Sequence, residues 1–370
     1  MPGPNPTTPD PFAFLVEVPP TAGPLWFDVE IPMHRIEAFP MVDGVASPRW
    51  VDIPQRRIVP YSQTFALPDG ARKLNLYELT GEPVFTSIRP GLDGQTRFLF
   101  VSEGFGDNGQ QQFFDACETM AARLLNIDPF KEVASSIRID GLFLPLRGGA
   151  VVNIKCGRSA EAEARLRPTL FGTQSCLSPA TEQLWGGDED RVRTLVARAL
   201  KQKGKGPISD VDFLAVLINS PDYGGAGSSG PTNLKPRIAW ATTGHRSSLE
   251  ILLHELGHAF GLQDEYITAY KEPLKPWRNI SDHPEPKNTP WRLMVTRDRD
   301  QLTLAKGGQW TGNPNDVGTF EGAGYQPDRR YRPSYDCRMR NLGQHFCPVC
   351  SDVILTGLDP AVQGRVGKET

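Results

Sequence analysis

Residues 254–266, with the sequence HELGHAFGLQDEY, carry the side chains of this chain that are best suited to chemistry. His254 and His258 are four residues apart, and on a helix that spacing places both imidazoles on one face, one turn apart. Both rings can therefore reach a single metal ion. Glu255, beside the first histidine, can act as a general base toward a water molecule in the open coordination position.

The chain after the second histidine is expected to turn back toward the metal ion. Gly261 ends the helix, because glycine adopts the left-handed conformation at little cost, and the returning chain brings Asp264 to the ion. The full pattern, H-E-x-x-H-x-x-G-x-x-D, is similar to that of the metzincin zinc peptidases, here with aspartate as the third ligand. Glu265 is the alternative third ligand. Otherwise it orients a histidine N–H group or holds the loop.

The segment around the two histidines has the pattern of a buried helix. Ser247 and Glu250 have the spacing of a capping box, which marks the start of a helix. Apolar residues then surround the helix on almost all sides, so it is expected to be central in the fold. Histidine and acidic side chains in so apolar a segment need a metal ion, or a network of hydrogen bonds in the core, to offset the cost of burial.

The composition is that of an ordinary globular protein. The chain has 370 residues, of which 39% are hydrophobic and 22% charged, which is enough for one large domain and a smaller one. The net charge of −3 argues against nucleic acid as the main partner. No apolar run approaches the ~20 residues of a membrane span. The N-terminus does not resemble a signal peptide, so the sequence by itself predicts a cytoplasmic protein.

Three regions are predicted along the chain. Residues 1–11 are proline-rich and expected to be disordered. Residues 12–81 contain short β-type runs separated by proline and glycine, which predict a small β-sandwich with a structural or docking role. Strands and helices alternate over residues 82–370, which predicts a mixed sheet with helices packed on it. The fold class is therefore α/β (α+β), with the histidine helix at the centre of the second domain.

Hydrophobic patterning assigns the elements of the second domain. Besides the helix that carries the histidines, helices are expected at 107–125 and 189–202. Strands are expected at 97–105, 137–146, 150–154, 212–220 and 237–242. The similarity to metzincin enzymes implies that strand 237–242, just before the histidine helix, lies at the sheet edge, where it can pair with an extended peptide. The glycine-rich run 223–230 is expected to be a loop without phosphate-binding residues. Residues 270–335 show little periodicity and are expected to form a long loop beside the substrate cleft.

Several stretches between about residues 80 and 360 carry a family resemblance. They read FLFVSEGF, NSPDYGGAG, HELGHAFGLQDEY, FEGAGY followed by YRPSYDCRMR, and FCPVC. In these motifs and their order the chain resembles the IgA-peptidase-like zinc metallopeptidases, metallopeptidase family sixty-four. The resemblance implies a zinc endopeptidase with one catalytic ion, with His254, His258 and Asp264 as ligands and Glu255 as base. It also implies a β-rich N-terminal domain and an extracellular or periplasmic location.

A metzincin-type site also needs a methionine turn, a tight loop that places a methionine beneath the metal-binding histidines. Met339 is the main candidate and Met294 the alternative, although either one can be an ordinary core methionine. Stabilisation of the oxyanion needs a donor besides the metal ion. Tyr325 and Tyr331 precede the expected turn and are candidates for that donor.

Three cysteines near the C-terminus allow two interpretations. Cys337 can form a disulfide with Cys347 or Cys350, which would tie the methionine turn to a C-terminal helix. Alternatively, the three cysteines and His345 hold a structural zinc ion. The disulfide is favoured, because the spacing from Cys337 does not fit a paired-knuckle zinc site.

Together these patterns predict a zinc-dependent endopeptidase that hydrolyses protein or peptide substrates through a zinc-bound water activated by Glu255. Two alternatives stay open. A metal-dependent amidase acting on cell-wall peptide would use the same residues. A non-catalytic binding protein on a peptidase fold would be expected to have lost the base, and Glu255 is intact.

Overall fold

The computed structural model describes the chain in several segments. Between residues 25 and 78 it gives the backbone of the strands alone. The segments described with their side chains are 82–91, 96–106, 108–145, 170–173, 184, 186–227, 235–268, 277–298, 310, 312–359 and 362–366.

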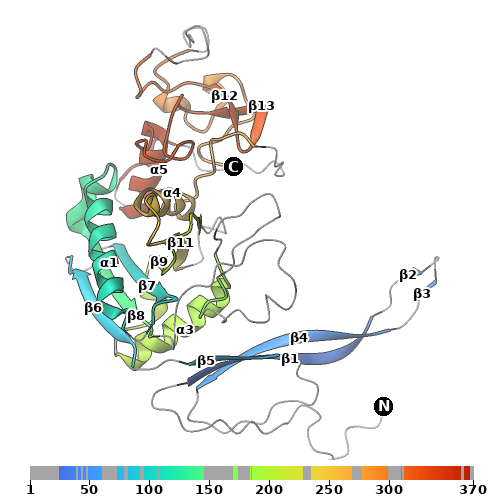
Figure 1. Cartoon of the computed structure of the whole chain (residues 1–370). Helices are drawn as coiled ribbons and strands as arrows, with labels where there is room; N and C mark the ends of the chain where they lie inside the picture. Colours follow the sequence, from blue (N-terminus) through green and yellow to red (C-terminus); the bar gives the residue numbers. More distant parts are fainter. Residues whose placement is uncertain are drawn as a thin grey trace, which may run out of the picture.

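The strands before residue 80 form a three-stranded antiparallel sheet, of order β4-β1-β5, and a short hairpin of β2 and β3 (Figure 1). Their bounds are β1 Leu25–Ala38, β2 Met41–Val42, β3 Val45–Ala46, β4 Arg49–Pro60 and β5 Lys73–Glu78. A sandwich needs two sheets packed face to face. The described strands of this region do not provide a second sheet of that kind, so the predicted sandwich is not confirmed. The domain boundaries stay predictions.

A six-stranded mixed sheet of order β10-β11-β9-β7-β8-β6 forms the centre of the rest of the molecule (Figure 1). The four inner strands are parallel, whereas β6 and β10 run antiparallel to them at the two edges. The bounds are β6 Val84–Arg89, β7 Thr96–Glu103, β8 Ile137–Phe143, β9 Phe213–Ile218, β10 Gly225–Gly227 and β11 Arg237–Thr242. The mixed sheet with its helices confirms the predicted α+β class; the expected strand 150–154 lies outside the described residues.

Side chains alternate between the two faces of this sheet, and each face has its own core. In β7, Phe98 and Phe100 belong to one buried cluster, and Leu99 and Val101 to the other, as expected for a strand covered on both sides. Helices α1, α4 and α5 contribute to the first cluster and α3 to the second.

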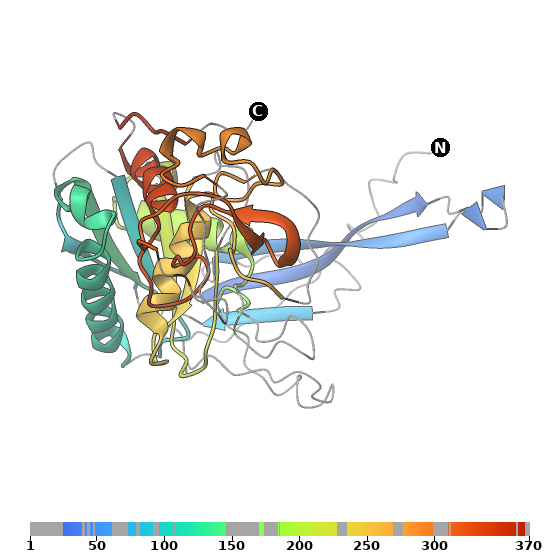
Figure 2. The same cartoon turned by 90° about the horizontal axis from the view of Figure 1, so that it is seen from above.

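Helix α4 packs on β11 and β10, at one end of the six-stranded sheet, and the bounds of all the helices follow. They are α1 Gln110–Leu125, α3 Glu189–Gln202, α4 Ser248–Ala259 and α5 Pro348–Leu358, with short 3₁₀ helices at Phe130–Ser136, Ile208–Asp210, Pro286–Asn288 and Arg292–Met294. Figure 2 shows the C-terminal part of the chain (red) running beside α4 (gold). No helix in the described part of the chain has both the length and the apolar character of a membrane span.

The expectation that strand 237–242 lies at the sheet edge is wrong. That strand is β11, and it is flanked by β9 on one side and by β10 on the other. β10 comes from the glycine-rich run 223–230, which was expected to be a loop, and it pairs antiparallel with β11. Glycine is a poor strand former, so its presence here reflects a close approach of backbones that a larger residue would prevent.

The expected capping box of α4 is also absent. The side chain of Ser247 makes no capping hydrogen bond. Glu250 instead forms ion pairs with Arg123, at 2.7 Å, and with Arg338. The carboxylate of Glu250, which the local sequence predicted to cap the start of the helix, is therefore paired with two arginines from distant parts of the chain.

Part of the region expected to be irregular forms a hairpin. β12 (Phe320–Ala323) pairs antiparallel with β13 (Gln326–Arg332). Tyr325, in the turn between them, has φ of 68°, and its backbone N–H donates to the carbonyl of Tyr266 at 2.9 Å. The hairpin thereby returns to the histidine motif.

Candidate metal centre

The histidines of α4 and the turn after it form a compact group of buried side chains. The rings of His254 and His258 are 5.0 Å apart between centroids. Gly261 has φ of 87°, and beyond it Asp264 faces both rings. Asp264 Oδ1 lies 2.9 Å from Nε2 of His254 and 3.4 Å from Nε2 of His258. The chain reversal thus brings Asp264, and not Glu265, to the two histidines.

Backbone carbonyls determine which nitrogen of each imidazole is protonated. Nδ1 of His254 donates to the carbonyl of Arg338, and Nδ1 of His258 donates to the carbonyl of Leu262, both at 2.9 Å. Because a carbonyl oxygen only accepts, each neutral ring has its proton on Nδ1 and a lone pair on Nε2. Metal-binding histidines are held in this way, with the second ring nitrogen bound to an oxygen.

The charges in the group favour a cation. Burial opposes ionisation of Asp264, yet the two imidazoles hold the pKa of that carboxyl well below its ordinary value. Against the opposite effect of burial, Asp264 raises the pKa of His254 and raises that of His258 to about 9. A buried carboxylate that draws protons onto two imidazoles is matched to a divalent metal ion, which would replace those protons.

Glu255 lies beside the first histidine on α4 and is outside the three converging side chains. Burial raises the pKa of its carboxyl, while the charges of His254 and His258 oppose that rise and Asp264 adds to it. A carboxyl with a raised pKa next to a candidate metal site is suited to accept and return a proton.

The two tyrosines suggested as oxyanion donors have other partners in the structure. The hydroxyl of Tyr325 donates to Oδ2 of Asp264, so it orients that carboxylate. The hydroxyl of Tyr331 lies 3.4 Å from Glu321. The left-handed backbone of Tyr325 is unfavourable for a bulky residue, which is typical of positions held in place at functional sites.

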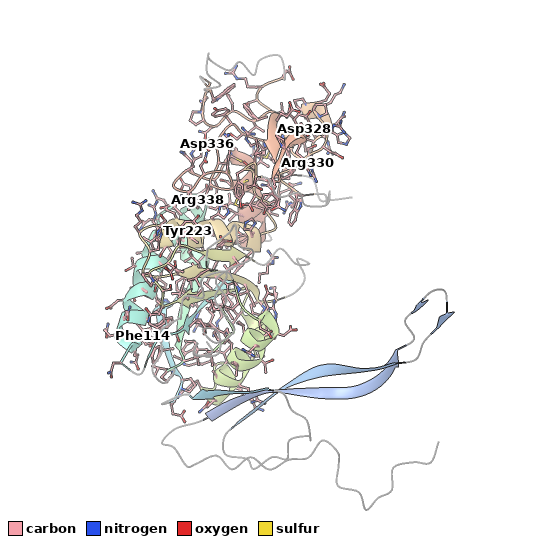
Figure 3. The ribbon with its side chains drawn as sticks, turned by 45° about the vertical axis from the view of Figure 1, so that its right-hand side comes forward. Phe114, Tyr223, Asp328, Arg330, Asp336 and Arg338 are labelled. Carbon is pink, nitrogen blue, oxygen red and sulfur yellow. The ribbon has the colours of Figure 1, made fainter. Side chains whose placement is uncertain are left out.

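Two further tyrosines at the site were not anticipated as functional. The ring of Tyr266 stacks on His254 at 6.5 Å between centroids. Tyr223, just before β10, is 43% exposed; its pKa is raised by partial burial and by the charges of Glu255 and Asp264. Tyr223 and Arg338 come from distant segments and both lie near α4 (Figure 3). The sequence signals for Tyr223 are its place at the start of the glycine-rich run and within the motif NSPDYGGAG.

Met339 lies against the helix that carries the histidines. A β-carbon at Gly257 would be 2.4 Å from its sulfur, and Met339 itself is completely buried. Its carbonyl accepts a hydrogen bond from the backbone N–H of Glu265 at 2.7 Å. Met294, the alternative for the methionine turn, belongs to the core that α1, α4 and α5 form.

Glycines allow β10 to approach α4 closely. A β-carbon at Gly225 would be 2.9 Å from Cγ of Glu255, and one at Gly227 would be 2.5 Å from Cβ of His258. The edge strand therefore runs along the part of α4 that carries these two side chains, at a distance that only glycine permits.

A comparison with protein families identifies the kind of protein that has this site. The family model described as IgA Peptidase M64 matches residues 93–313 and 309–358, which include the whole histidine motif. The chain belongs to this family. No curated protein matches the chain. Membership implies a peptidase, a hydrolase that acts on protein or peptide substrates.

This family member has a second cluster of buried side chains beside the first. The sulfurs of Cys337, Cys347 and Cys350 and a carboxylate oxygen of Glu265 all lie within 4.8 Å of one another. The three cysteines are free thiols, so the favoured disulfide is not present. Glu265, and not His345, is the fourth member of the cluster, because the chain reversal after α4 points consecutive carboxylates toward different neighbours.

Proposed function

We propose that the protein is a zinc-dependent endopeptidase in which His254, His258 and Asp264 bind the ion and Glu255 is the general base. The main support is the pair of imidazoles that backbone carbonyls hold with Nε2 toward Asp264. Two nitrogens and one carboxylate oxygen, with a fourth position open, are the donor set of catalytic zinc. When bound, zinc polarises the scissile carbonyl and acidifies the attacking water.

Glu255 and Asp264 have different roles: Glu255 transfers protons, and Asp264 sets the charge around the ion. Glu255 takes the proton of the attacking water and delivers it to the leaving amine. Its raised pKa, caused first by burial, makes the carboxyl a stronger base than an exposed glutamate. Asp264 brings one more negative charge to the ion than a third histidine would, so the water is acidified less and depends more on Glu255.

The peptide substrate is proposed to bind along β10. This strand is the edge of the described six-stranded sheet on the side of α4, and an extended peptide can add to such an edge through backbone hydrogen bonds. The glycines of β10 bring the bound peptide close to Glu255 and His258. Tyr223, at the entrance to the strand and partly exposed, is the proposed donor to the oxyanion.

Hydrolysis and metal content of a Glu255→Gln variant test this function. Glutamine nearly matches glutamate in shape, so the variant should fold and retain zinc, and it should lose at least ~10²-fold in hydrolysis of casein. Glu118→Gln is the matched control, because Glu118 lies on the exposed side of α1.

Three outcomes would contradict the proposal. Activity of Glu255→Gln within a few-fold of the unaltered protein would remove Glu255 from the mechanism. Cleavage of cell-wall peptide but not of casein or other proteins would favour the amidase. A folded, zinc-loaded protein that cleaves neither substrate would be a binding protein.

A further inference from the structure

We propose that Glu265, Cys337, Cys347 and Cys350 form a second metal site, which holds a structural zinc ion. The site is separate from the proposed catalytic centre, although Glu265 is the neighbour of Asp264 in the chain. Four protein donors leave no open position for water or substrate, which is the arrangement of structural zinc sites.

The spacing of the four donor atoms fits a tetrahedral ion. All of them lie within 4.8 Å of one another. In a tetrahedral site with zinc–sulfur bonds of about 2.3 Å, the sulfurs are roughly 3.8 Å apart. The donors therefore need to move by about 1 Å or less to reach that geometry. Three thiolates select a thiophilic ion such as zinc over magnesium or calcium, which bind oxygen ligands.

The carboxylate of Glu265 is the strongest evidence for an ion in this cluster. It is completely buried. Its Oε1 accepts a hydrogen bond from Asn279 at 3.0 Å and lies 3.3 Å from the sulfur of Cys350. Within the part of the chain that the structure describes, its Oε2 has no hydrogen-bond partner. Buried polar atoms are seldom left in that state, and a metal ion would provide both a partner and a balancing charge.

Arg332, whose charge acts on this carboxylate, forms no ion pair with it among the described contacts. The guanidinium of Arg332 donates its hydrogen bonds to backbone carbonyls, those of Glu321, Gly322 and Tyr335. Among the residues that the structure describes, no positive charge is therefore in contact with Glu265.

Backbone N–H groups are already directed at two of the sulfurs. Cys347 caps the N-terminus of α5, and its sulfur accepts from the N–H of Cys350 at 3.5 Å. The sulfur of Cys337 accepts from the N–H of Cys347 at 3.3 Å. Such donors, together with the N-terminus of a helix, favour the thiolate, which is the form that binds metal.

A disulfide explains the cluster less well. It would join two of the three sulfurs and leave the third one buried as a thiol. It would also leave Oε2 of Glu265 without a partner, because forming the bond adds neither a donor nor a positive charge. A metal ion engages all four side chains at once.

An ion in this site would hold the proposed catalytic centre together. Cys337 is followed by Arg338, whose carbonyl accepts from His254, and by Met339, whose carbonyl accepts from Glu265. The ion would fix this loop to α5 and to the chain segment that ends the histidine motif. Its role is therefore to position Asp264 and the ring of His254.

Cobalt substitution gives a direct test, because only the second site contains sulfur. The cobalt-loaded protein should show an intense thiolate-to-cobalt charge-transfer band in the near ultraviolet, and this band should survive in the His258→Ala/Asp264→Ala double variant. Zinc analysis should find two ions per chain in the unaltered protein and one in the double variant, in line with the two clusters.

Cysteine variants then assign the band. Cys350→Ser, made in the double variant, should lose the band and the remaining zinc, whereas Cys117→Ser should keep both, since Cys117 is a buried free cysteine on α1. If Cys350→Ser does not fold, Cys350→His supplies another zinc ligand and should restore folding and metal.

Either of two results would contradict the proposal of a second metal site. One is a cobalt-loaded protein of unaltered sequence without a thiolate band. The other is mass spectrometry of denatured, alkylated protein that finds two of the three cysteines joined in a disulfide. Neither result touches the proposed function, because the activity assay depends on the first site and on Glu255.

Discussion

The sulfur of Met339 lies directly against Gly257, in the turn of α4 between the two histidines, where a β-carbon would be only 2.4 Å from it. A helix with glycine at an interior position is usually less stable than one with alanine there, by roughly 0.5–1 kcal/mol. At position 257 the contact with Met339 decides whether alanine stabilises or destabilises the protein relative to glycine. The methionine loop can approach the helix only because residue 257 has no side chain.

Gly257→Ala should therefore destabilise the protein and weaken zinc binding, the reverse of what helix propensity predicts. The added methyl group either pushes Met339 away or displaces α4 relative to the loop that holds His254. Urea unfolding and zinc titration measure the two effects. In a Gly257→Ala/Met339→Ala double variant the clash is absent, so part of the loss should be recovered through coupling of the two sites. Equal losses in the single and double variants would show that the contact is unimportant.

Tyr325→Phe should lower zinc affinity by about 10–100-fold, the usual effect of removing a hydrogen bond to a metal ligand. The hydroxyl of Tyr325 donates to Oδ2 of Asp264, and without it the carboxylate is free to rotate. Tyr331→Phe is the matched control, because its hydroxyl lies by Glu321 instead. Competition with a chromophoric chelator gives both affinities, and similar values for the two variants would exclude an orienting role for Tyr325.

Gly227→Val should remove most peptidase activity. A β-carbon at this position would lie 2.5 Å from the backbone carbonyl of Glu255 and 2.5 Å from Cβ of His258, so β10 must move away from α4. Ala226→Ser is the control, because alternate residues of a strand point to opposite faces. Hydrolysis of a peptide series is the measurement. Unchanged activity of Gly227→Val would mean that β10 does not position the substrate.

Glu250 should contribute stability that is lost in acid. Burial alone would raise its pKa, but hydrogen bonds from Arg338 and Arg123 lower it below the ordinary value. A group whose pKa is lower in the folded state stabilises the fold above its unfolded pKa, and that contribution disappears as the pH falls through the folded pKa. Glu250→Gln also leaves the buried guanidinium of Arg338 unpaired, which costs about 3 kcal/mol.

Urea unfolding of Glu250→Gln at neutral and at acidic pH tests this expectation. The difference in unfolding free energy from the unaltered protein should be largest at neutral pH and should shrink as the pH falls below the ordinary pKa of glutamate. Glu118→Gln serves as the control, since its ion pair with Arg89 is exposed and contributes only about 0–1 kcal/mol. A difference that is independent of pH would remove Glu250 as the titrating group.

The sequence alone identified the features that are local along the chain. The spacing of His254 and His258 and the glycine at position 261 determine how one helix and one turn present their side chains, whatever surrounds them. Apolar runs likewise located β7, β9 and β11, and helical spacing located α1, α3 and α4, because each buried element must match the period of its own backbone. The α+β class follows from the order of those elements.

The partners of those elements were decided only by the tertiary structure. No pattern within a single segment predicts that β10 pairs with β11, or that Glu250 forms an ion pair with Arg338 in place of a capping bond. Asp264 and Glu265 are adjacent carboxylates, yet one meets two histidines and the other meets three cysteines more than seventy residues later in the chain. Each of these outcomes depends on contacts between segments far apart in sequence, whose geometry is set by packing of the whole core and not by the spacing of residues within any one segment.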